Sequence, residues 1–147
     1  MKTIQTSLLT SVFLLSTAFC TLAAKPGWTE NFDQAQKKAS AEQKPMLLDF
    51  TGSDWCGWCI KIDKEVFAKP EFKSFSEKSL VLVELDFPQG KTLPDAVKAQ
   101  NSDLQRKFKV NGYPTLVLLS PAGKEITRWE GFKPTFLEEL KKAAGEK

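Results

Sequence analysis

Two cysteines separated by two residues, Cys56 and Cys59, stand between a short apolar segment and a segment with helical spacing. Residues 45–51 are long enough for one strand, and the apolar side chains from Ile60 to Phe67 recur at helical intervals. A strand that leads into a helix with Cys-x-x-Cys at the junction is the setting of a dithiol redox site. The spacing predicts that both sulfurs lie on the first turn of that helix.

The place of the first sulfur predicts its chemistry. At the start of a helix, a side chain lies near unpaired backbone N–H groups and the positive end of the helix dipole. This environment favours the thiolate, which is the nucleophile in disulfide exchange. We therefore expect Cys56 to be the nucleophile and Cys59, one turn further into the helix, to be the resolving thiol.

Other uses of a cysteine pair are restricted by composition. A structural zinc site takes about four Cys or His ligands, and the chain has three cysteines and no histidine. The absence of histidine also excludes c-type haem attachment and Cys-His nucleophilic catalysis. We expect no metal and no cofactor. An inert structural disulfide remains an alternative, although so small a ring adds little stability.

Residues 1–24 have the pattern of a secretory signal peptide. They carry one charge, and an apolar run over 8–19 is followed by small residues that permit cleavage after Ala23 or Ala24. The alternative is an uncleaved membrane anchor, but a spanning helix needs about 20 apolar residues. We expect a signal peptide followed by one domain over 25–147.

The third cysteine, Cys20, lies inside this segment. A bacterial lipoprotein signal would place small residues before its cysteine, whereas Phe19 precedes Cys20. Signal cleavage would remove Cys20 and leave the dithiol pair as the only thiols. We expect a periplasmic or other extracytoplasmic protein, since thiol–disulfide chemistry on client proteins belongs to such compartments.

The charge pattern gives no sign of a nucleic-acid partner. The formal net charge is +3, and lysines are interspersed with acidic residues. No long basic stripe or internal repeat is present, so a solvated surface explains the lysine pairs. We expect a monomer that does not bind nucleic acid.

The rest of the chain alternates between helical and strand patterns. Helices are predicted over 31–43, 56–67, 70–76, 94–108 and 133–144, with a break near Asn101 and Ser102. Strands are predicted over 46–51, 81–86, 114–120 and 125–129, the first two buried on both faces. This order gives an α/β fold, with a central mixed β-sheet flanked by helices on both faces.

Three motifs in this order resemble the thioredoxin superfamily: Asp49-Phe50, Trp55-Cys56-Gly57-Trp58-Cys59 and Gly112-Tyr113-Pro114-Thr115. The resemblance spans residues 28–144. Residues 50–56 and 64–67 further resemble exported bacterial thioredoxin-like proteins, including the DsbH type and the C-terminal domain of DsbD. Two departures are a Gly-Trp dipeptide where thioredoxin has Gly-Pro, and one extra residue in the loop before Cys56.

The resemblance implies a thioredoxin fold and protein-disulfide oxidoreductase activity. It makes Pro114 a cis-proline that faces the cysteines and leaves the backbone of Tyr113 free to pair with an extended client strand. It places Asp49 behind Cys59, where a carboxyl group assists proton transfer. The alternative for Asp49 is a strand-end residue that reaches water; if buried, its pKa should be raised.

An aromatic rim beside the motif is expected to hold client chains. The expected client-binding residues are Trp55, Trp58, Tyr113, Pro114, Gly131 and Phe132. Ordinary core packing is the alternative for the aromatic members, and it is what we expect of Trp28 and Phe50.

Together these features indicate an exported thiol-disulfide oxidoreductase that acts on cysteine-containing clients. The reducing direction is favoured because Trp58 occupies a place where strong oxidants of the superfamily often carry histidine. A reductase would need a membrane electron donor, such as a DsbD-type protein. The alternatives are a disulfide isomerase or oxidase, and a non-catalytic binding or chaperone module.

Overall fold

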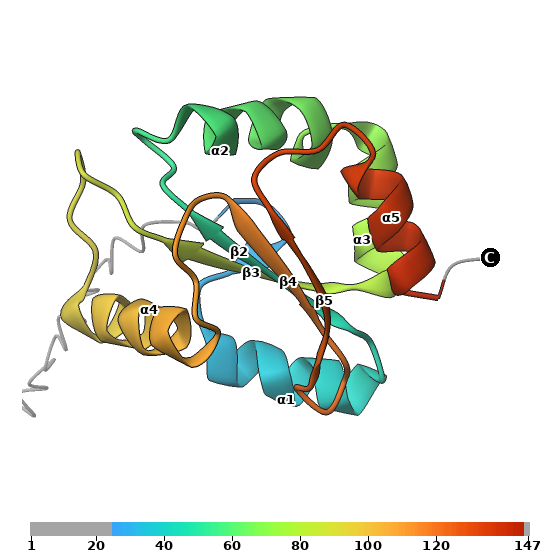
Figure 1. The fold of residues 1–147 in the computed structure, drawn as a ribbon. Helices are drawn as coiled ribbons and strands as arrows, with labels where there is room; N and C mark the ends of the chain where they lie inside the picture. The colour runs from blue at the N-terminus through green and yellow to red at the C-terminus, as the bar shows by residue number, and fades with distance from the viewer. Residues whose placement is uncertain (1–24, 146–147) are drawn as a thin grey trace, which may run out of the picture.

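The computed structural model describes residues 25–145 of the 147-residue chain. The predicted signal peptide and Cys20 lie outside the described residues. A five-stranded sheet of order β1-β3-β2-β4-β5 forms the centre (Figure 1). Its strands are β1 (Trp28–Thr29), β2 (Met46–Thr51), β3 (Val81–Asp86), β4 (Thr115–Leu119) and β5 (Glu125–Glu130). β1 and β2 are both parallel to β3, whereas β4 is antiparallel to both β2 and β5.

Helices cover both faces of this sheet. They are α1 (Phe32–Glu42), α2 (Gly57–Ile62), the π-helical segment η1 (Asp63–Phe67), α3 (Pro70–Ser79), α4 (Asp95–Lys107) and α5 (Phe136–Ala143). α1 and α4 lie on one face, and α2, α3 and α5 lie on the other (Figure 1). This arrangement confirms the predicted α/β class with helices on both faces. Among residues 25–145, none of the helices has the length and apolarity needed to cross a membrane.

Two apolar cores fill the space between the sheet and its helices. The core on the α2 side includes Leu47, Ile62, Phe67, Phe72, Leu116, Phe136 and Leu140. The core on the α1 side includes Ala35, Ala39, Leu48, Phe50, Val83, Leu104 and Phe108. Successive strand residues point to opposite faces, so Leu47 and Leu48 enter different cores. By the same alternation, Asp49 points to the face that α2 covers.

Local sequence signals account for several helix boundaries. The side chain of Asn31 accepts a hydrogen bond from the Gln34 N–H at 2.9 Å and caps the start of α1. α1 ends at Glu42 and is followed by Gln43, which adopts a left-handed conformation with φ of 53°. Pro70 stands at the start of α3, where its missing N–H costs no hydrogen bond.

Several details differ from the expected elements. The helix expected over 56–67 is π-helical in its second half, η1, and α5 is shorter at both ends than the expected 133–144. β1 was not predicted, because two residues are too few for a recognisable strand pattern; it pairs Trp28 with Leu82. α3 continues to Ser79 instead of ending at Ser76. The predicted break near Asn101 was wrong: α4 is continuous, and Asn101 is buried with its side-chain amide donating to the Asp86 carbonyl at 2.9 Å.

Candidate active site

The two cysteines lie where β2 passes into α2, as their spacing predicts. Cys56 has an extended backbone and directly precedes the helix, and its Sγ accepts a hydrogen bond from the Cys59 N–H at 3.2 Å. The sulfurs are joined in a disulfide, with the two Cα atoms 5.2 Å apart. Cys56 is 7% exposed and Cys59 is 2% exposed. A reagent from solvent therefore reaches Cys56 more readily than Cys59.

An exposed aromatic wall stands on one side of the dithiol. Trp58, which is 58% exposed, stacks on Phe132 with ring centroids 6.3 Å apart and an interplanar angle of 19°. The ammonium of Lys61 lies 5.1 Å from the Trp58 ring and 5.2 Å from the Phe132 ring. A cation at this distance over an aromatic face is attracted by the ring. Lys61 therefore helps to hold the two rings together.

A second aromatic wall contains Trp55, Tyr113 and Phe87. Trp55 is 43% exposed and meets Tyr113 edge-on at 5.9 Å. Its indole N–H donates to the Phe87 carbonyl at 2.8 Å, and the Phe87 and Tyr113 rings lie 5.1 Å apart. The hydrogen bond fixes the ring of Trp55 although much of its surface faces solvent.

The loop before Cys56 is tied to the loop that follows β3. The carboxylate of Asp54 accepts hydrogen bonds from the N–H groups of Gln89, at 3.0 Å, and Gly90, at 2.7 Å. These bonds, chiefly that from Gln89, lower the pKa of Asp54 below its usual value. Ser53 donates its N–H and its hydroxyl to the Asp86 carboxylate at 2.9 and 2.6 Å.

The start of β4 lies beside the loop that carries Phe132. The peptide bond between Tyr113 and Pro114 is cis. The Pro114 carbonyl accepts a hydrogen bond from the Gly131 N–H at 2.8 Å. Gly131 has φ of +75°, a conformation that residues other than glycine rarely adopt. This bond fixes the position at which Phe132 leaves the sheet.

Asp49 is buried in the middle of β2 and is 1% exposed, so it does not reach water. The ammonium of Lys25 lies 3.4 Å from Asp49 Oδ2, while Asp49 Oδ1 has no hydrogen-bond partner. The same ammonium contacts Glu84 Oε1 at 3.0 Å and Asp63 Oδ1 at 3.1 Å. We call Lys25, Asp49, Asp63 and Glu84 the carboxylate cluster.

Burial raises the pKa of Asp49 from an ordinary 3.8 to about 7, even though the nearby Lys25 ammonium opposes this change and Glu84 adds to it. Burial works against the charge of Lys25 as well. The attraction of Asp49, Glu84 and Asp63 outweighs it, so the pKa of Lys25 is raised. Asp49 can therefore change its protonation near neutral pH, whereas Lys25 stays charged.

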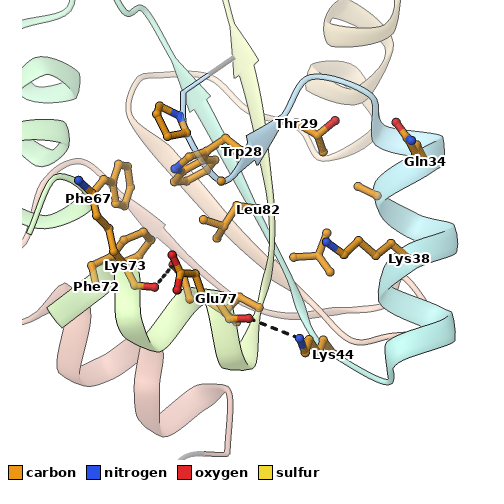
Figure 2. A pocket seen from close by; sticks show the side chains of 16 residues that line it. Trp28, Thr29, Gln34, Lys38, Lys44, Phe67, Phe72, Lys73, Glu77 and Leu82 are labelled. Carbon is orange, nitrogen blue, oxygen red and sulfur yellow. Dashed lines mark hydrogen bonds between the residues drawn. The ribbon is translucent and has the colours of Figure 1, made fainter. Parts of the chain in front are cut away.

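A separate pocket of about 590 Å³ lies at the β1 edge of the sheet, between α1 and α3 (Figure 2). Trp28, Lys38, Lys73 and Glu77 are among its lining residues. No cysteine lines the pocket, so it is not the place of disulfide chemistry. Within residues 25–145, no group of three or more His, Cys, Asp or Glu side chains is arranged to hold a metal ion.

The structure groups the sequence-predicted residues around two aromatic walls and one buried carboxyl. Trp28 and Phe50 are core residues, as expected, with exposures of 8% and 0%. Five contributors were missed: Lys25, Lys61, Asp63, Glu84 and Phe87. Phe87 follows a buried strand directly, which is a usable signal. Lys61 and Asp63 gave none, because charged residues at helical spacing normally face solvent. Lys25 gave none because it precedes β1, outside any helical or strand pattern.

A family model described as a thioredoxin-like domain matches residues 32–144. The chain belongs to the thioredoxin-like family. This thioredoxin-like protein is 40% identical over 112 residues to the disulfide bond reductase DsbH of Chlamydia pneumoniae, a match that covers 76% of the chain and 66% of that relative. It is 36% identical over 105 residues to the thioredoxin-related protein DsbJ of the same species, covering 71% of the chain and 30% of DsbJ.

Solved structures agree with this placement. A DsbH oxidoreductase superposes with a TM-score of 0.77 and 34% identity, over 93% of this chain and 96% of that chain. A thioredoxin from Thermus thermophilus has a TM-score of 0.63 and 22% identity, over 81% of this chain and 87% of that chain, which shows the shared fold. The thioredoxin-like protein spans only part of the length of its curated relatives. It is DsbH-like and carries a disulfide-forming Cys56–Cys59 pair.

Proposed function

We propose that the protein is an exported thiol-disulfide oxidoreductase that reduces disulfides in client proteins. The observation that carries this proposal is the position of Cys56 at the start of α2, paired with the buried Cys59. A helix start favours the thiolate of the first cysteine. The buried second cysteine is positioned to react only within the complex that the first one forms.

The reaction has two exchange steps that balance. The Cys56 thiolate attacks one sulfur of a client disulfide, forms a mixed disulfide and releases the other client sulfur as a thiolate. The Cys59 thiolate then attacks Cys56 Sγ, closes the intramolecular disulfide and releases the second client sulfur. Two electrons and two protons pass from the dithiol to the client. In this scheme Asp49, whose pKa of about 7 lies near neutral pH, accepts the proton that Cys59 loses.

Client binding is assigned to the exposed rings and the backbone beside the dithiol. The walls formed by Trp58 with Phe132 and by Trp55 with Tyr113 offer apolar contact to an extended chain. The residue preceding Pro114 offers its backbone for pairing with the client strand. A cysteine-containing protein is therefore the proposed partner, and a monomer with no cofactor suffices for this scheme.

The reducing direction rests on the groups around the thiols. Trp58, between the cysteines, carries no positive charge that would stabilise a thiolate. Asp54 is held in its charged form by the Gln89 and Gly90 N–H groups and disfavours a nearby thiolate. A less stabilised thiolate makes a weaker oxidant. We place the potential nearer that of thioredoxin, about −270 mV, than that of DsbA, about −120 mV.

The test combines a redox titration against glutathione with the in-cell state of the cysteines by thiol alkylation. A reductase should have a low potential, keep Cys56 and Cys59 mainly reduced in the envelope, and reduce insulin disulfides. A potential above about −160 mV, with a mainly oxidised pair, would show a disulfide donor instead. Absence of any insulin reduction would favour a non-catalytic binding module.

Periplasmic location and a DsbD-type membrane donor are parts of the same proposal. N-terminal sequencing of the protein from the envelope should begin at Ala24 or Lys25. A chain that begins at an acylated Cys20 would instead show a lipoprotein. Deletion of the membrane donor in the host should convert the Cys56–Cys59 pair to its oxidised form, whereas an unchanged pair would exclude that donor.

A further inference from the structure

One ammonium group, that of Lys25, contacts carboxylates from three elements of the fold. They are Asp49 on β2 at 3.4 Å, Glu84 on β3 at 3.0 Å and Asp63 on η1 at 3.1 Å. The side chains of Asp49 and Glu84 are only 1% and 8% exposed, whereas that of Asp63 is 43% exposed. Lys25 thus links the carboxylate of Asp63, on η1, to the two buried carboxylates of Asp49 and Glu84.

The sheet register makes this cation necessary. Asp49 and Glu84 are direct neighbours across the β2–β3 pair, and their side chains share the face that α2 covers. Two adjacent buried carboxylates repel each other and lose hydration, so removing a compensating charge is costly. In the part of the chain that the structure describes, Lys25 is the cation within ion-pair distance of both. Glu30 and Lys91 act on Glu84 only at longer range.

The position of Lys25 is fixed by contacts of its own. Its backbone carbonyl accepts a hydrogen bond from the Trp28 N–H at 2.9 Å. Its ammonium lies 4.8 Å from the Trp28 ring and 5.3 Å from the Phe67 ring. A half-buried lysine between two rings and three carboxylates loses far more freedom than a surface lysine. It is part of the packed structure.

The cluster is also connected to the turn that carries the resolving cysteine. The backbone N–H of Asp63 donates to the Cys59 carbonyl, so the side chain that meets Lys25 stands one turn beyond Cys59. From Asp63 the chain is π-helical, with the Ala68 N–H bonded to the Asp63 carbonyl at 2.8 Å. Such segments are frequent at functional sites. Asp49 Oδ1, without a hydrogen-bond partner, remains available to take up a proton.

We propose that Lys25 is a positioning residue for the resolving step: its ammonium, in contact with both Asp49 and Glu84, favours the carboxylate form of Asp49 that accepts the Cys59 proton. This inference rests on the proposed function for the Asp49 and Cys59 roles. Lys25 lies outside the Cys-x-x-Cys motif, in the segment that precedes β1. Predicted signal cleavage after Ala23 or Ala24 retains it in the exported protein.

The sign of the expected effect follows from the charges. Lys25 favours the carboxylate of Asp49, whereas Glu84 and Asp63 disfavour it. Replacing Lys25 with a neutral residue should therefore move the Asp49 titration to higher pH. Asp49 would be protonated at neutral pH, and disulfide reduction would need more alkaline conditions. Neutralising Asp63 should move the same titration in the opposite direction.

The experiment compares Lys25→Met, Lys25→Arg and Asp63→Asn, with Lys38→Met as a matched control on an exposed lysine of α1. The carboxyl carbon of Asp49 is titrated by NMR in the oxidised protein, and insulin reduction is measured from pH 5 to 9. Lys25→Met should raise both midpoints by about one unit or more, so that reduction at pH 6 falls about tenfold and recovers at pH 9. Lys25→Arg should restore most of the wild-type profile, and Lys38→Met should match it.

Asp63→Asn is a second test if Lys25→Met fails to fold. Because the Asp63 charge disfavours the Asp49 carboxylate, this variant should lower the midpoints of the Asp49 titration and of the pH profile of insulin reduction. An unchanged Asp49 titration in the folded Lys25→Met or Asp63→Asn protein would overturn the proposal. A shifted titration with an unchanged pH profile of insulin reduction would overturn it as well, since Lys25 would then be structural only. If wild-type protein reduces no insulin, the proposed function fails, and the NMR titration alone judges the action of Lys25 on Asp49.

Discussion

The indole of Trp58, which directly precedes Cys59, lies nearly parallel to the phenyl ring of Phe132, with an interplanar angle of 19°. Trp58 comes from the first turn of α2, whereas Phe132 comes from the loop between β5 and α5. The two segments are far apart in the sequence, so this wall exists only in the folded protein. It makes a flat apolar surface next to Cys56.

Removing the Trp58 ring should weaken client binding more than it slows disulfide exchange. We expect Trp58→Ala to raise KM for a disulfide-containing client about tenfold, with kcat changed less, because an exposed aromatic anchor supplies on the order of 1–2 kcal/mol of contact. Ile126→Ala is the control, since Ile126 is also a large exposed apolar residue, at 48% exposure, but lies on β5. Equal KM values for the two variants would remove Trp58 from the client-binding surface.

The two cysteines should give distinct variants because only one is placed to attack first. Cys56→Ser should abolish insulin reduction. Cys59→Ser keeps the nucleophile but lacks the resolving thiol, so it should accumulate mixed disulfides with clients. Non-reducing electrophoresis of envelope extracts separates these outcomes. Mixed disulfides in Cys56→Ser instead would reverse the assigned roles.

Asp49→Asn should stabilise the protein, increasingly so as the pH rises to about 7. The folded-state pKa of Asp49 is about 7, above its ordinary 3.8. A raised pKa means that the folded protein holds this proton more tightly than the unfolded chain, so the stability contributed by Asp49 is complete below pH 3.8, falls as the pH rises to about 7, and is constant above that. Urea denaturation at pH 5 and pH 9 should show an advantage for Asp49→Asn that grows by about 3 kcal/mol between the two pH values. An advantage independent of pH would contradict the raised pKa.

Gly52→Ala should disturb the wall that contains Trp55. A Cβ at Gly52 would lie 2.6 Å from the Trp55 ring. This ring cannot move freely, because its N–H is bonded to the Phe87 carbonyl at 2.8 Å. We expect a loss of about 1–3 kcal/mol in unfolding free energy and a changed Trp fluorescence spectrum. Gly112→Ala is the control, since a Cβ there meets no atom within 4 Å; a similar loss in both variants would rule out the ring contact as the cause.

Most of the fold follows from periodic patterns in the sequence. The continuous apolar residues of β2 and β3 indicate strands buried on both faces, and every residue of both strands is buried. The Cys-x-x-Cys junction likewise predicts the strand-to-helix turn and the position of Cys56 before α2. These signals are local, so a single sequence contains them in full.

The parts that escaped prediction depend on contacts between distant segments. The ion pairs of Lys25 with Asp49 and Glu84 require the parallel pairing of β2 with β3, which fixes a register that local patterns do not contain. Asn101 resembled a helix breaker because its side chain competes for backbone hydrogen bonds. In the structure the Asn101 side-chain amide instead donates a hydrogen bond to the Asp86 carbonyl, so the helix continues.

The extra residue before Cys56 has a consequence for how clients reach the site. A longer loop usually moves more freely, yet Asp54 and Trp55 of this loop are bonded to the backbone of residues 87–90. The loop before Cys56 and the loop after β3 therefore form one connected unit on the Trp55 side of the dithiol. A bulky client cannot displace one of these loops without displacing the other. Under the proposed function, disulfides in flexible, protruding segments of a client should therefore be the preferred substrates.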